Sequence, residues 1–255
     1  MCTLTLAWQV FGGSPVVVAA NRDEALERSS EPPDVYREEP LVIAPRDAEA
    51  GGTWIGTNEH GVFAGITNRW NDADLAGERS RGLLVADVLA CETARGAVDL
   101  IERTTSEYEY AGFNLTVADA DDAVWLEWDG TLERVALEPG VHVAVNVGLD
   151  GRFAIPESRR EAGERQAENA RAVREALAVE PGEGARTWLE RAGSVLGDHE
   201  YGVCIHGDGF GTRSSSLIAL GNDSMYEFAA GPPCRTRYEP IALEQVDGID
   251  VERQF

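Results

Sequence analysis

The sequence predicts an α+β fold in which two antiparallel sheets pack together and helices lie outside them. Hydrophobic residues make up 43% of the 255 positions, enough to build a globular core. The expected strands follow one another in hairpins and do not alternate one for one with helices, which excludes a doubly wound parallel sheet. No Gly/Ser-rich linker interrupts the chain, so we expect a single domain over residues 1–255.

The first part of the chain is predicted to be mainly strands. Thr3–Phe11 alternates polar and apolar residues, which places Leu4, Leu6, Trp8 and Val10 on one face. Glu31–Pro45 holds four of the eleven prolines and is expected to be irregular. The other strands are a continuous apolar one at Val16–Ala20 and a hairpin at Thr53–Thr57 and Val62–Thr67.

The remainder alternates between helical and strand patterns. Apolar residues at helical spacing predict a helix over Gly82–Arg103 with a break near Gly96, and four strands follow between Gly112 and Val147. The elements expected after these are helices at Glu157–Val179 and Ala185–Val195, then strands at Tyr201–His206, Arg213–Leu220 and Met225–Ala230.

The charge balance excludes several partners and chemistries. The formal net charge is −23, from 22 arginines against 45 acidic residues, and the chain has no lysine. Such a surface repels nucleic acid and anionic membranes, and Schiff-base or P-loop lysine chemistry is absent. An acidic, lysine-free surface also resembles that of proteins from halophilic organisms, in which high salt screens self-repulsion.

No hydrophobic run approaches the ~20 residues that span a bilayer, and the N-terminus has no signal-like pattern, so we expect a cytoplasmic protein without membrane insertion. The four cysteines, at positions 2, 91, 204 and 234, form no CxxC pair, and the four histidines are equally scattered. We therefore predict no metal site, and we expect Cys204 and His206, which alternate on a predicted strand, to be core residues.

Cys2 suggests a specific chemistry. If Met1 is removed, the thiol and a free α-amino group belong to one residue, and the amine can accept the thiol proton near neutral pH. Arg22 and Asp23 end the strand expected to pair with the Cys2 strand, so Arg22 would favour the thiolate and Asp23 could hold the amine. The alternative is a chance cysteine beside a polar strand end.

Several motifs in order along the chain support the first interpretation. They are Met1-Cys2, Ala20-Asn21-Arg22-Asp23-Glu24, Gly51-Gly52-Thr53-Trp54-Ile55-Gly56, Thr67-Asn68, Gly112-Phe113-Asn114-Leu115 and Gly211-Thr212-Arg213-Ser214. Together they resemble the NRDE-motif family, named for the transport and Golgi organisation protein 2 group. The resemblance implies an N-terminal-nucleophile hydrolase fold, a four-layer αββα sandwich. It also implies similarity to cysteine acylases of the choloylglycine class, which cleave carbon–nitrogen amide bonds.

The resemblance also implies roles for individual residues. Cys2 would be the nucleophile, with Arg22 stabilising its thiolate and Asp23 binding the α-amino group. The oxyanion and positioning roles would fall to Asn68 and Asn146, and Arg213 would add a cation, making with Arg22 a local cationic pocket. The residues expected to bind substrate are Asn21, Trp54, Thr67 and Asn114.

Two functions remain open at this stage. The first is a hydrolase or acyltransferase that acts on an amide or thioester of a small molecule and requires no cofactor. The second, which rests on the resemblance alone, is a non-catalytic carrier of haem, acyl-CoA or lipid. The sequence does not predict the oligomeric state.

Removal of Met1 is the premise of the first function and the first testable prediction. We expect the purified protein to be lighter by one methionine residue and N-terminal sequencing to begin at Cys2, because aminopeptidases remove Met1 when the second residue is small. Intact-mass measurement checks this. A chain that keeps Met1 has no amine on Cys2, which would contradict the proposed chemistry.

Overall fold

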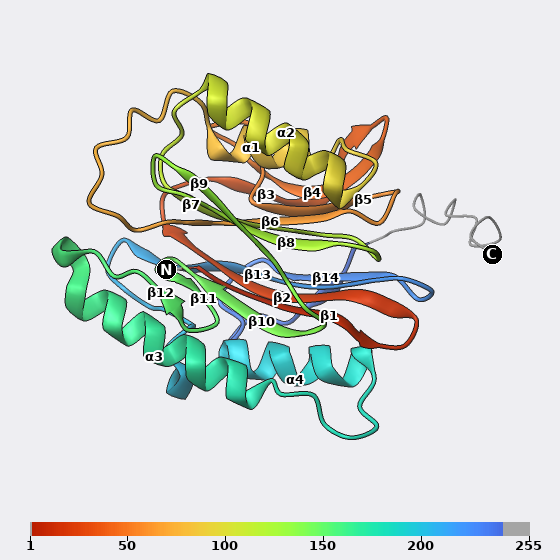
Figure 1. Cartoon of the computed structure of the whole chain (residues 1–255). Coiled ribbons are helices and arrows are strands. Elements are labelled where there is room, and N and C mark those ends of the chain that lie inside the picture. Colours follow the sequence, from red (N-terminus) through yellow and green to blue (C-terminus); the bar gives the residue numbers. More distant parts are fainter. Residues whose placement is uncertain (1, 242–255) are drawn as a thin grey trace.

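Two antiparallel sheets stack face to face between two layers of helices (Figure 1). The structure is a computed structural model and describes residues 2–241. Helices α1 (Arg81–Val88) and α2 (Ala94–Glu107) cover one sheet, and α3 (Arg160–Ala176) and α4 (Ala185–Gly197) cover the other. The predicted α+β sandwich is therefore confirmed. Within residues 2–241, no helix has the length and apolar character needed to cross a bilayer.

The first sheet has eight strands, with β1 and β2 near its centre. Strand β1 pairs with β10 on one side, Thr3 opposite Val145, and with β2 on the other, Thr3 opposite Asn21. In spatial order the strands are β12 (Arg152–Phe153), β11 (Gly148–Leu149), β10 (Gly140–Val145), β1 (Thr3–Phe11), β2 (Ser14–Ala25), β13 (Phe210–Leu220), β14 (Met225–Ala229) and β15 (Glu239–Pro240).

The second sheet has seven strands, which keep their sequence order across the sheet. They are β3 (Ser30–Glu38), β4 (Leu41–Asp47), β5 (Ile55–Asn58), β6 (Phe63–Asn68), β7 (Phe113–Ala118), β8 (Ala123–Trp128) and β9 (Leu132–Ala136). The predicted hairpins are confirmed, but the last of the four expected strands between Gly112 and Val147, β10, joins the other sheet.

Three apolar cores fill the spaces between the four layers. Leu4, Leu6 and Trp8 of β1 point into the core between the sheets, and Ala7 points to the core under α3 and α4. The prediction that Val10 shares the face of Leu6 is wrong, because Val10 packs on the helix side. The cause is an irregularity in the β1–β2 ladder after Trp8, where Gln9 has a positive φ of 52°.

The expectation of an irregular segment at Glu31–Pro45 is also wrong, because this segment forms most of β3 and β4. Strand β3 is an edge strand and pairs with β4 through two register shifts. An edge strand with bulges tolerates proline, because one side of the strand needs no ladder hydrogen bonds.

Two other boundaries differ from prediction. Segment Tyr201–His206 is not a strand: it follows the short 3₁₀ turn η2 (His199–Tyr201) and makes a single bridge, His206 to Gly211. The predicted helix over Gly82–Arg103 does break, but before Gly96. Thr93 caps α2, its hydroxyl accepting the Gly96 N–H at 3.1 Å.

Gly52 lies where two backbones meet directly beside the predicted site. A Cβ atom at Gly52 would lie 2.4 Å from the carbonyl carbon of Gly82, at the start of α1. The Thr53 N–H donates to the Gly82 carbonyl at 3.1 Å in the same contact. The loop that carries Trp54 can therefore pack on α1 only because both residues lack side chains.

We predict that Gly52→Ala destabilises the protein by about 1–3 kcal/mol, because a rigid backbone must move to accommodate the new methyl group. Gly12→Ala is the matched control, since no atom lies within 4 Å of its Cβ position. Urea denaturation of both variants measures the difference. Equal free energies of unfolding would contradict the close contact.

Candidate functional site

Cys2 lies at the end of β1, beside a pocket of about 70 Å³ between the two sheets. Its backbone N–H donates to Asn146 Oδ1 at 3.0 Å, and its thiol donates to the Asp23 carbonyl oxygen at 3.6 Å. Asn146 directly follows β10, and the pairing of β10 with β1 brings it opposite Cys2. The two residues, 144 positions apart, thus meet because of strand register.

Asn146 is the centre of a hydrogen-bond network. Its Oδ1 also accepts from Gln166 Nε2 at 2.7 Å, and its Nδ2 donates to the Asn68 carbonyl at 2.6 Å. Gln166 is fully buried on α3 and was not predicted. It lies four residues before Ala170 on the inner stripe of that helix, so a polar residue in an apolar stripe was the available signal.

Asp23 is buried next to Thr212 of β13, whose hydroxyl donates to Asp23 Oδ1 at 2.5 Å. Burial raises the pKa of the Asp23 carboxyl to about 6, although the Thr212 hydrogen bond and the Arg22 charge oppose the shift. Thr212 was not predicted as a site residue. The carboxyl is therefore protonated below about pH 6 and mostly ionised at pH 7.

Arg22 lies next to Asp23 on β2, so its side chain points to the opposite face of the sheet. The guanidinium stacks over Trp54 at 4.1 Å from the ring centroid and is 7% exposed. Its carboxylate partners are Glu24 at 3.7 Å and Asp47 at 3.8 Å. The positive charge is thus partly neutralised within the site.

The Cys2 thiol is not held as a thiolate. Burial raises the pKa of the Cys2 thiol, and the Arg22 charge opposes this without reversing it. The Arg22 charge thus acts in the expected direction, toward the thiolate, but it does not offset the burial of the thiol. A neutral thiol needs a base that removes its proton.

Arg213 does not contribute to this pocket, contrary to prediction. The β2–β13 ladder shifts register between Thr212 and Ser214, so Arg213 is the extra residue of a bulge. Its guanidinium donates to the Leu26 carbonyl at 2.6 Å. The prediction that Arg22 and Arg213 form a cationic pocket is therefore wrong. A second positive charge that interacts with Cys2 is that of Arg81, at the start of α1.

Some of the remaining predicted site residues line the pocket, and others make hydrogen bonds to the protein backbone. Trp54, Thr67 and Asn68 line the pocket, and Asn68 is an exposed residue. Asn21 also borders it, but its Nδ2 donates to the Leu196 and Val203 carbonyls, both at 2.9 Å.

Asn114 does not line this pocket, although its Nδ2 donates at 3.4 Å to the hydroxyl of Thr67, which does. It is buried between the sheets, and its Nδ2 donates to the Val145 carbonyl of the other sheet at 2.8 Å. The structure therefore gives Asn114 an inter-sheet contact in place of the substrate contact expected from the sequence.

Solved structures of acylases and amidases share this fold. Penicillin V acylase from Agrobacterium tumefaciens superimposes with a TM-score of 0.54 at 14% identity, over 96% of this chain and 87% of that one. The N-acylethanolamine-hydrolyzing acid amidase ortholog of Caenorhabditis elegans gives 0.57 at 16% identity, over 85% and 92%. This chain has the N-terminal-nucleophile hydrolase fold.

The chain belongs to the Transport and Golgi organisation 2 family, whose model matches residues 1–230. The homolog of Bos taurus is 31% identical over 144 residues, 53% of this chain and 51% of that protein. The Mus musculus homolog is 28% identical over 144 residues, with the same coverage. The chain thus spans about half the length of the curated relatives it matches, and the family resemblance predicted from the motifs is confirmed.

The raised pKa of Asp23 gives a testable pH dependence. A carboxyl whose pKa rises on folding contributes stability that is present below its ordinary pKa of 3.8 and lost as the pH rises through about 6. Relative to wild type, we expect Asp23→Asn to gain about 2 kcal/mol of unfolding free energy between about pH 4 and pH 7.5.

Urea denaturation at both pH values measures this gain. Asp99→Asn, which changes an exposed carboxyl on α2, is the control and should gain none. A pH-independent difference between Asp23→Asn and wild type would contradict the burial of an ionisable carboxyl.

Proposed function

We propose that this protein is an N-terminal-cysteine hydrolase or acyltransferase that cleaves an amide or thioester bond of a small molecule. The observation that carries the proposal is the placement of Cys2, whose backbone nitrogen is held by Asn146 at the edge of the pocket. The shared fold with acylases and amidases supports the reaction class by analogy.

The proposed reaction begins with transfer of the thiol proton to the α-amino group that Met1 removal creates on Cys2. Asn146 Oδ1, 3.0 Å from that nitrogen, orients the amine as a base. The sulfur then attacks the carbonyl carbon, a carbon–sulfur bond forms, and the carbonyl oxygen becomes an oxyanion.

The second half of the reaction restores the enzyme. The oxyanion collapses and the carbon–nitrogen bond breaks, and the leaving amine takes the proton held by the α-ammonium group. Water then attacks the thioester on Cys2, giving a carboxylic acid and the free thiol. With a thioester substrate the leaving group is a thiol, and with an acceptor amine in place of water the outcome is acyl transfer.

Asn68 supports the proposal as the oxyanion donor. Asn68 is among the residues that line the pocket, its backbone carbonyl accepts from Asn146 Nδ2 at 2.6 Å, and one such donor is worth about 3–4 kcal/mol in the transition state. Asn146, in contrast, directs its Oδ1 at the Cys2 nitrogen and donates its Nδ2 to a backbone carbonyl. We therefore assign Asn146 a positioning role.

The pocket walls favour a compact, uncharged acyl group. Apolar contributions come from Leu4, Trp54, Ile55 and Ile66. Arg22 is paired with the carboxylates of Glu24 and Asp47. No excess positive charge is therefore left to bind an anionic substituent. Substrate charge, if present, would then lie on the leaving group outside the pocket.

A carrier function has one observation in its favour. A hollow of about 680 Å³ lies against α3 and β10, within the ~300–1,000 Å³ typical of ligand sites. Val141 and Phe153 give it apolar surface. Its border carries Arg171 and Arg174 but also Asp150 and Glu175, and Arg174 pairs with Asp150 at 3.4 Å. A ligand of the size of haem or acyl-CoA fits this hollow better than the pocket of about 70 Å³ at Cys2.

We predict that Cys2→Ala lowers turnover by roughly 10³-fold or more, because the sulfur forms the covalent intermediate. Cys91→Ala, which removes another partly buried thiol, should retain full activity. A panel of amides and acyl-CoA thioesters provides the assay, with a covalent acyl adduct at Cys2 read by mass spectrometry. Turnover that survives in Cys2→Ala would contradict the nucleophile assignment.

Ligand titration separates the carrier from the hydrolase. One haem or acyl-CoA bound per chain, lost in Arg174→Glu and kept in Arg165→Glu, would support the carrier if no substrate in the panel is turned over. Arg165 is the matched control because it lies on the same helix, paired with Glu161 and away from the hollow.

A further inference from the structure

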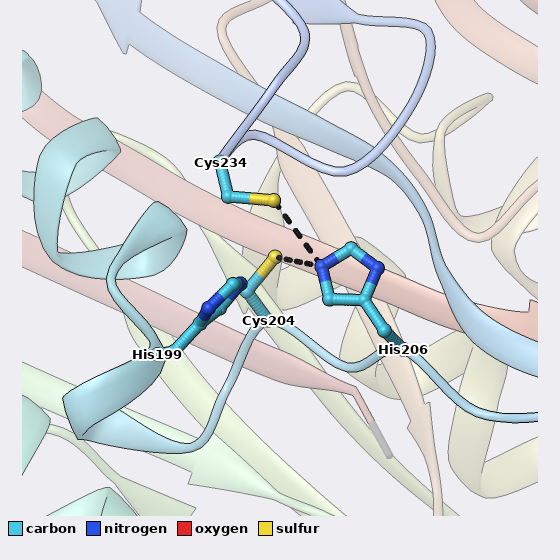
Figure 2. A group of neighbouring side chains, drawn as sticks. All are labelled: His199, Cys204, His206 and Cys234. Atoms are coloured by element: carbon cyan, nitrogen blue, oxygen red, sulfur yellow. Dashed lines mark hydrogen bonds between the residues drawn. The ribbon is translucent and has the colours of Figure 1, made fainter.

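Four potential metal ligands meet on the side of the first sheet that faces α4. They are His199, Cys204, His206 and Cys234, and their ligand atoms all lie within 4.8 Å of one another (Figure 2). In Figure 2 the Nε2 atom of His206 points at both sulfurs, and the His199 ring lies beside Cys204. Cys204 is buried, and the other three side chains are exposed.

Two separate segments supply these ligands. The first three lie in the connection from η2 toward β13, spaced as H-x₄-C-x-H, and the fourth lies in the loop after β14. The spacing matches no common zinc-finger pattern, because 27 residues separate His206 from Cys234. The sequence therefore predicted no metal site, and it assigned Cys204 and His206 to the core.

Two distances from His206 are close to the edge lengths of a metal-centred tetrahedron. Zn–S bonds of about 2.3 Å and Zn–N bonds of about 2.0–2.1 Å separate neighbouring ligand atoms by about 3.3–3.8 Å. His206 Nε2 lies 3.2 Å from Cys234 Sγ and 3.7 Å from Cys204 Sγ. The rings of His199 and His206 are 5.1 Å apart and nearly perpendicular, at 79°.

Core packing does not explain this cluster, because three of its four members are exposed. Both cysteines are free thiols, with an imidazole nitrogen directed at both of them. Two soft sulfurs and two imidazoles within 4.8 Å of one another form a donor set typical of tetrahedral zinc sites. We propose that His199, Cys204, His206 and Cys234 bind one zinc ion.

The proposed site is structural, because four protein ligands leave no open position for substrate. The ion would join the loop before β13 to the loop after β14 and restrain both. Its ligands lie next to residues that support the Cys2 site. Ile205, between Cys204 and His206, donates its N–H to the Thr212 hydroxyl at 2.9 Å and accepts the Thr212 N–H at 2.9 Å.

Thr212 in turn donates to Asp23, and the carbonyl of Val203 accepts from Asn21 at 2.9 Å. The metal-binding segment therefore supports two residues of the N-R-D-E motif, Asn21 through a direct hydrogen bond and Asp23 through Thr212. This role does not depend on turnover, so metal content tests the proposal independently of the proposed function.

Metal analysis of the full chain, purified under reducing conditions without chelator, provides the first test. We expect one zinc ion per chain by elemental mass spectrometry. Replacement by Co²⁺ should give the visible bands of a tetrahedral ion together with thiolate-to-cobalt charge transfer. Removal of zinc by a chelator should lower the melting temperature, and added Zn²⁺ should restore it.

Matched variants locate the site. Cys234→Ser and His206→Ala change exposed residues, so both should fold, lose the zinc and lose the chelator-induced melting shift. Cys91→Ser and His60→Ala are controls outside the cluster and should keep the ion, as should Cys2→Ala. The cobalt spectrum of the wild-type chain gives a result even if a variant fails to fold.

Three results would overturn the proposal. One is a reduced wild-type protein that binds neither Zn²⁺ nor Co²⁺. Another is zinc that persists in the Cys234→Ser and His206→Ala variants. The third is a disulfide between Cys204 and Cys234 in the protein as isolated, detected as the loss of two hydrogens in the intact mass.

Discussion

The candidate site depends on the pairing of β1 with two strands at once. The ladder with β10 brings Asn146 opposite Cys2, and the ladder with β2 brings Asn21 beside the same chain end. A shift of one residue in either register would move the neighbouring side chains to the other face of the sheet. The apolar core between the sheets opposes such a shift, because Leu4 and Leu6 would then leave it.

Much of the fold could be predicted from local sequence. The alternation of Leu4, Leu6 and Trp8 gives strand β1, and the continuous apolar run Val16–Ala20 gives the core of β2. Where the prediction from local sequence was wrong, contacts between distant parts of the chain determined the structure. The prolines of β3 are tolerated because that strand lies at a sheet edge, a position that no local pattern records.

The site was predictable only in part, for similar reasons. The motifs identified Cys2, Arg22 and Asp23, but a bulge in β13 turned Arg213 away from the pocket. The partners of the motif residues, Gln166 and Thr212, come from distant elements and carry no motif signal of their own. Residues so far apart in the sequence come into contact only when both sheets are folded, so local sequence could not predict these contacts.

Polar side chains at the layer boundaries do more than line a pocket. Asn114 bridges the two sheets, and Asn21 donates to the Leu196 carbonyl in α4 and to the Val203 carbonyl after it. In an otherwise apolar interior such contacts are costly when incomplete, so they favour one alignment of the layers over its neighbours. The alignment of the layers on one another therefore determines the site geometry as much as the strand register within each sheet does.

The segment from Val203 to Thr212 has a consequence for local opening of the molecule. Its hydrogen bonds reach both Asn21 and Asp23, so both supports are lost together when this segment separates from the sheet. Regions of this kind open with their own free energy, smaller than that of global unfolding. The free energy of this local opening then sets the fraction of molecules with an intact pocket. Amide hydrogen exchange in the segment measures that free energy.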